Sequence, residues 1–149
     1  MKFVALVVIS IICCLAGCSE ATNSTGMISK RIGDAVRTPG ATEVRLSELT
    51  TFGWDRLYVF PPGATREEMC KFIGAGRNNC GRVIRVEKTP ESHVAMVFDL
   101  QGQVTHFEFH ALKNGQFDID FGPQGIPRSM TNFRVRNSTG TGEIRLELQ

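Results

Sequence analysis

The sequence predicts an α+β domain in which one main helix packs on an antiparallel sheet of five to six strands. Two observations favour this fold class. Several short segments alternate apolar and polar residues with the period of two that is typical of half-buried strands. One segment after Thr65 instead carries apolar residues at helical spacing and a helix-start signal. No internal repeat is visible, so we expect a single domain.

The first clear strand is expected within Trp54–Phe60. This segment is rich in aromatic and β-branched residues on both of its faces, as is typical of an interior strand. Pro61-Pro62-Gly63 ends it, because proline has no N–H group to donate to a neighbouring strand.

The helix is expected to begin at Thr65. Thr65 and Glu68 have the spacing of a capping box, in which each side chain accepts a hydrogen bond from the backbone of the other residue. Gly74 or Gly76 ends the helix. The apolar residues at helical spacing are Met69, Phe72 and Ile73.

A hairpin is expected from His93–Leu100 and Thr105–Phe109, with Gln101-Gly102 between them. Only an even-length loop places the apolar residues of both strands on one face, because a slip by one residue would invert one strand. The facing apolar pairs are then Val94 with Phe109 and Met96 with Phe107.

The C-terminal third predicts further strands. Apolar residues alternate in Phe117–Phe121, with Asp118 and Asp120 on the other face. The segments Phe133–Val135 and Ile144–Leu148 flank a glycine-rich loop and predict a final hairpin.

The N-terminus has the pattern of an export signal. Met1-Lys2 precedes the apolar run Phe3–Leu15, which is too short to span a bilayer as a mature helix. Leu15-Ala16-Gly17-Cys18 resembles the lipobox of bacterial lipoproteins. The resemblance implies removal of residues 1–17, acylation of Cys18 and attachment to a membrane, and Ser19 then favours the periplasmic side of the outer membrane. A cleaved secretory peptide with an incidental cysteine is the alternative.

Residues 18–42 are expected to form a flexible tether, because they are rich in Ser, Thr, Asn, Gly and Ala without a sustained hydrophobic period. Such a tether would reach about 25–30 Å. The folded domain is therefore expected to span residues 43–149.

The five cysteines have distinct expected roles. Cys13 and Cys14 leave with the signal peptide and Cys18 takes the lipid, so Cys70 and Cys80 remain. Two thiols in an oxidising compartment usually pair. We therefore predict a structural Cys70–Cys80 disulfide. A redox-active pair is the alternative, although the nine-residue gap lacks the close Cys-x-x-Cys spacing.

The charge balance argues against a nucleic-acid partner. The chain has 17 Lys and Arg against 15 Asp and Glu, and loss of Lys2 leaves 16 basic residues. These basic residues are scattered along the sequence, whereas a phosphate-binding surface needs a cluster of them.

One eleven-residue motif, Phe52–Pro62, resembles a pattern found in small, mostly uncharacterised exported bacterial proteins. That pattern runs Phe-x-Trp-Asp-x-hydrophobic-Tyr-Val-Phe-x-Pro. The resemblance implies a common fold and supplies no activity. Trp54 and Tyr58 are either core residues or aromatic anchors of a binding surface.

The histidines suggest one candidate metal site. In the expected hairpin register His93 lies directly opposite His110, and Glu108 shares their face. Two imidazoles and a carboxylate suit zinc or copper. His106 lies too far along the strand to share a metal ion with His110. The alternative is a solvated sheet face that carries polar side chains.

The sequence therefore favours a binding protein over an enzyme. It shows no nucleophile elbow, no His-Glu-x-x-His helix and no phosphate-binding glycine loop, and no cofactor is expected. We expect a membrane-anchored, periplasm-facing protein-binding module, with an immunity-type inhibitor of a secreted toxin as the sharper hypothesis. The alternatives are a periplasmic metal-binding protein and an envelope structural or assembly factor.

Overall fold

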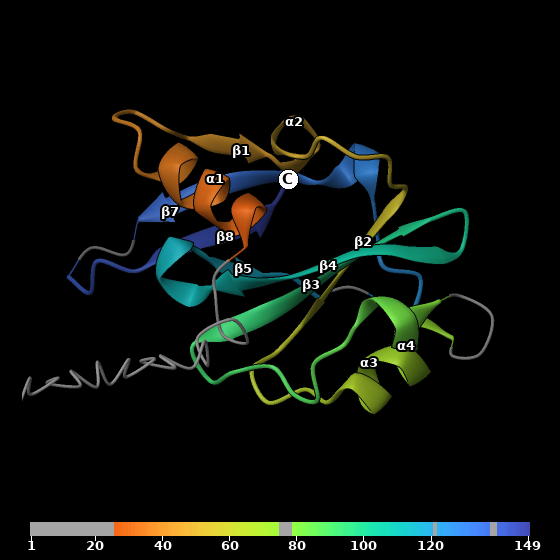
Figure 1. The fold of residues 1–149 in the computed structure, drawn as a ribbon. Helices are drawn as coiled ribbons and strands as arrows, with labels where there is room; N and C mark the ends of the chain where they lie inside the picture. Colours follow the sequence, from red (N-terminus) through yellow and green to blue (C-terminus); the bar gives the residue numbers. More distant parts are fainter. Residues whose placement is uncertain (1–25, 75–78, 121, 138–139) are drawn as a thin grey trace, which may run out of the picture.

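A computed structural model describes residues 26–74, 79–120, 122–137 and 140–149 (Figure 1). The helices are α1 (Met27–Val36), α2 (Leu46–Leu49), α3 (Arg66–Ile73) and α4 (Cys80–Val83), with short 3-10 turns η1 (Leu112–Asn114) and η2 (Arg128–Met130). The strands are β1 (Glu43–Arg45), β2 (Arg56–Phe60), β3 (His93–Leu100), β4 (Gln103–Ala111), β5 (Gln116–Asp118), β6 (Ile126–Pro127), β7 (Asn132–Asn137) and β8 (Ile144–Leu148). The predicted α+β class is confirmed.

The strands form two sheets of four rather than one sheet of five to six. The central sheet has the order β4-β3-β2-β6 and is antiparallel throughout. The second sheet has the order β1-β7-β8-β5, and its β5–β8 pair is parallel. Figure 1 shows the second sheet and α1 on one side of the central sheet, and α3 and α4 on the other. We call these sides the inner and the outer face of the central sheet.

Each face of the central sheet has its own hydrophobic core. The inner core joins α1, the second sheet and residues such as Trp54, Leu57 and Phe98. The outer core joins α3, α4 and residues such as Phe60 and Val97. Because both faces are covered, every residue of β3 from His93 to Asp99 is buried.

The expected tether is wrong from residue 26 onward. Residues 27–36 form α1, and Ile28, Ile32 and Val36 are each at most 5% exposed within the inner core. These residues recur every four positions, which places them on one helix face. The folded domain therefore includes α1 and does not begin at residue 43. Residues 18–25, like the expected signal peptide, lie outside the described residues.

The expected hairpin has the right turn and the wrong register. Gln101 and Gly102 both have positive φ, 53° and 77°, as a two-residue hairpin turn of type I′ requires, and Leu100 pairs with Gln103. A β-bulge then lets Phe98 pair with His106, so Thr105 is the extra residue of β4. Beyond the bulge, His93 pairs with Ala111 rather than His110, and both expected apolar pairs are lost.

The helix and the disulfide on the outer face agree with prediction. The Thr65 side chain accepts from the Glu68 N–H while the Glu68 carboxylate accepts from the Thr65 N–H, and Gly74 ends α3 with a left-handed backbone. The Cys70–Cys80 disulfide is confirmed, and it joins α3 to α4. No helix among the described residues is long and apolar enough to cross a membrane.

Candidate functional site

The candidate site lies between two sheet edges that have no strand neighbour in the described ranges. On the central sheet, β6 pairs only with Arg56 and Leu57, so residues 58–60 of β2 form an open edge. On the second sheet, β5 pairs with β8 on one side only. Open edges present backbone N–H and C=O groups that another extended chain can pair with.

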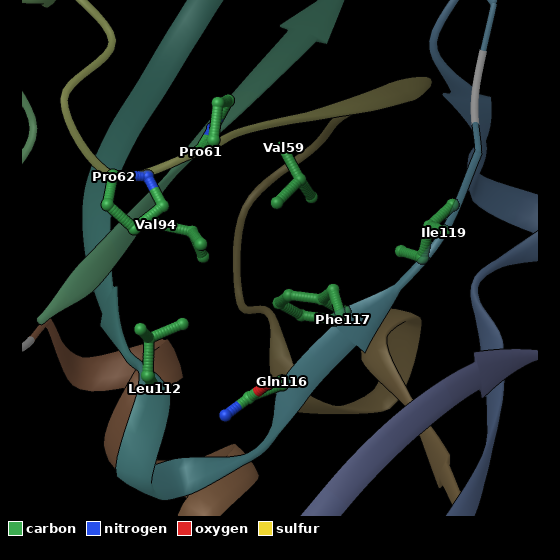
Figure 2. A pocket seen from close by; sticks show the side chains of 8 residues that line it. All are labelled: Val59, Pro61, Pro62, Val94, Leu112, Gln116, Phe117 and Ile119. Carbon is green, nitrogen blue, oxygen red and sulfur yellow. The ribbon is translucent and has the colours of Figure 1, made fainter. Parts of the chain in front are cut away.

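An apolar cleft of about 370 Å³ lies between these edges. Figure 2 shows its lining side chains around one hollow, with Val59 of β2 and Phe117 of β5 on opposite sides. We call it the Val59 cleft. Its lining residues are Val59, Pro61, Pro62, Val94, Leu112, Gln116, Phe117 and Ile119. None of them is charged, and the Gln116 amide is the single polar side chain, so the cleft suits an uncharged apolar ligand.

One wall of the cleft is held in place by helix α1. The wall runs through η1, where Leu112 lines the cleft and Asn114 is 6% exposed. The Asn114 side-chain amide donates to the Ser29 backbone oxygen (3.0 Å) and its oxygen accepts from Arg37 (2.8 Å). The Ser29 hydroxyl in turn accepts from the backbone N–H of Ala111 (3.0 Å). We call Ser29, Arg37 and Asn114 the α1 clamp.

Glu108 attaches the start of α1 to β4. Its side chain is 9% exposed, and one carboxylate oxygen accepts from the backbone N–H of Ser29 (2.8 Å). This supplies a cap that Gly26, the residue before the helix, cannot provide. The Gly26 N–H also donates to the Phe109 oxygen (3.1 Å), and a Cβ at Gly26 would overlap the Glu108 carboxylate.

His110 lies behind the cleft wall and is fully buried. Its Nε2–H donates to the Gly115 oxygen (2.6 Å), and its ring lies 4.9 Å from that of Phe117. Nδ1 has no hydrogen-bond partner among the residues described. Burial lowers the pKa of His110 from 6.5 to about 4, against the opposing effects of the Gly115 oxygen and Glu108. The imidazole is therefore neutral near pH 7.

The predicted metal set is not brought together. His93 lies on the outer face near Phe109, whereas Glu108 and His110 lie on the inner face, because the bulge shifts the register by one residue. Burial lowers the pKa of His93, with a smaller contribution from Lys113. His106, which was expected to lie too far along the strand to share a metal ion with His110, instead contacts Glu108 (3.3 Å). In the described part of the chain, no three His, Cys, Asp or Glu side chains are grouped to hold a metal ion.

Trp54 and Tyr58 are core residues on opposite faces of the central sheet. Trp54 is 1% exposed, and its indole N–H donates to the Thr50 hydroxyl (2.8 Å). Tyr58 is 5% exposed in the outer core, where burial raises its pKa, with a further rise from Asp99. The surface-anchor interpretation is therefore wrong for both. Val59, the residue after Tyr58, points into the cleft instead.

A second apolar hollow adjoins the Val59 cleft across Pro61 and Pro62, which line both. Phe72 contributes to it and is 43% exposed. The sequence predicted Pro61 and Pro62 as the end of a strand. Pro61 and Pro62 therefore marked where β2 ends, but the edge of β2 is open because β6 pairs only with Arg56 and Leu57, and no sequence signal indicated this.

A comparison of the chain with protein-family models, with curated proteins and with solved structures finds no match.

Proposed function

We propose that this protein is an exported, lipid-anchored binding protein whose Val59 cleft takes an extended apolar segment of a partner protein. The observation that carries the proposal is the position of the cleft between two open sheet edges. An extended peptide gains backbone hydrogen bonds from a sheet edge and selectivity from a pocket for its alternate side chains. The cleft supplies both, with Val59 and Phe117 as the central apolar contacts.

The lining favours an uncharged segment. A charged side chain that entered the cleft would lose its hydration without gaining an ion pair, because no lining residue is charged. The Gln116 amide can satisfy one polar group of the ligand. An immunity-type inhibitor and an envelope assembly factor are both special cases of this binding function.

The binding site can be tested with the acetylated, amidated peptide Lys-Thr-Val-Thr-Val-Thr-Lys. We expect it to shift the backbone amide NMR signals of β2 and β5, and Val59→Glu to weaken its binding about tenfold or more, or roughly 1.4 kcal/mol. Val86→Glu is the matched control, because Val86 is also half-buried but packs against the outer core. Equal binding by wild type and Val59→Glu would reject the cleft as the site.

The anchor is tested separately. Cys18→Ser is expected to abolish labelling by a fatty-acid analogue, and Ser19→Asp to retain more protein at the inner membrane. Labelling that persists in Cys18→Ser would reject the lipid anchor but would leave the cleft proposal standing.

A further inference from the structure

Helix α1 lies very close in sequence to the proposed anchor. Only residues 19–25 separate Cys18 from Gly26. The backbone N–H of Gly26 donates a hydrogen bond to the Phe109 oxygen of β4. Whatever their conformation, eight Cα–Cα steps span at most about 29 Å. A domain of this size is roughly 35 Å across. The surface diametrically opposite Gly26 therefore cannot reach the membrane, whereas the end of the domain that carries α1 can lie against it.

The solvent-exposed side of α1 has the composition of a membrane contact at its anchor-proximal end. Met27 is 66% exposed, the highest value among the large hydrophobic residues of the described chain. Lys30 follows one turn later and is also exposed. The acidic residue on this side, Asp34, comes another turn further from the anchor. Ile28 and Ile32 bury the opposite side of the helix, so α1 cannot rotate to hide Met27.

We propose that Met27 and Lys30 form a docking surface that seats the domain on the phospholipid bilayer that carries its anchor. The proposal rests on the lipid anchor proposed above. Met27 enters the boundary between headgroups and acyl chains, and the Lys30 ammonium contacts anionic headgroups. The short reach of residues 19–25 keeps both side chains near the bilayer, which raises their local concentration there.

The test uses the full lipidated protein in vesicles of brominated phosphatidylethanolamine and phosphatidylglycerol. In Met27→Trp, we expect bromine to quench the added tryptophan emission and the emission to shift to shorter wavelength. The emission of native Trp54, which is 1% exposed, is measured in wild type and serves as the baseline for the emission of the added tryptophan. Met130→Trp is the matched control, because Met130 is 50% exposed on η2, and its added emission is expected to stay unquenched.

Adding Lys30→Glu to Met27→Trp is expected to reduce the quenching about twofold in anionic vesicles and to leave it unchanged in neutral phosphatidylcholine. If wild type floats with the vesicles but Met27→Trp is quenched no more than Met130→Trp, the docking surface is wrong and the anchor stands. If the protein does not float with the vesicles at all, both the lipid anchor and the docking surface are wrong.

Discussion

The two faces of the central sheet are closed in different ways. The outer face is covered by α3 and α4, whose main constraints are local: a capping box over three residues and a disulfide over ten. The inner face is closed by segments far apart in sequence, as in the hydrogen bond between Ser29 and Ala111, 82 residues apart. The inner face also contains the buried polar groups of the α1 clamp and ends in the Val59 cleft. The proposed binding site therefore lies on the face that is assembled from distant segments.

The largest expected effect is a loss of stability when the inner core is disrupted. Ile32→Ala removes a side chain that is 1% exposed in the core between α1 and the second sheet, so it should lower the free energy of unfolding by about 2–5 kcal/mol. Met27→Ala, on the solvent side of the same helix, should change it by less than about 0.5 kcal/mol. Urea denaturation measures both. Equal stabilities would mean that α1 does not belong to the folded domain.

The next effect is a loss of stability in acid that originates on the inner face. The pKa of His110 is about 4 in the folded protein and 6.5 in the unfolded chain, so the unfolded chain binds more protons between these values. Stability is therefore full above pH 6.5 and falls as the pH drops toward 4. The full loss is about 3 kcal/mol.

Urea denaturation at pH 7.5, 5.5 and 4.5 measures this loss, and His110→Gln should flatten the pH dependence. His106→Gln is the control, because the His106 side chain is 36% exposed. An unchanged slope in His110→Gln would show that other groups cause the acid sensitivity.

The smallest of the three effects concerns the outer face. Reduction of Cys70–Cys80 should lower the free energy of unfolding by about 2–3 kcal/mol, because the disulfide restricts the unfolded chain. Binding of the Thr-Val peptide to the Val59 cleft should stay unchanged, since neither cysteine lines it. Loss of peptide binding in the reduced, still folded protein would show that the two faces are coupled.

Local signals explain what the sequence could predict. Thr65 and Glu68 specify a helix start within four residues, Gly74 supplies its end, and Gln101-Gly102 supplies a two-residue turn. Each of these acts between near neighbours, so it can be recognised without knowledge of the fold. The α1 helix had a comparable signal in Ile28 and Ile32, which was hidden by the polar residues around them.

The rest depends on contacts that no local pattern specifies. The bulge at Thr105 inverts β4 relative to the expected register. Because both faces of β3 are buried, alternation along β3 could not show which of its faces matches the apolar residues of β4. The Val59 cleft requires Phe117 to lie near β2, and this depends on how the second sheet, in which β5 pairs with β8, packs on the central sheet. Pro61 indicated where β2 ends but not what lies beside it.

The bulge also bears on how this protein can change during evolution. Thr105 is exposed and is the extra residue of the bulge, so both its side chain and its place in β4 can be lost at little cost. Without it, Val104 would still pair with Asp99 and His106 with Phe98, so Glu108 and His110 would stay beneath α1. Loss of a paired residue between Phe107 and Ala111 would instead turn over the part of the strand that follows it. Descendants of this chain should therefore vary at residue 105, in identity and in presence, while the length of the segment 107–111 stays constant.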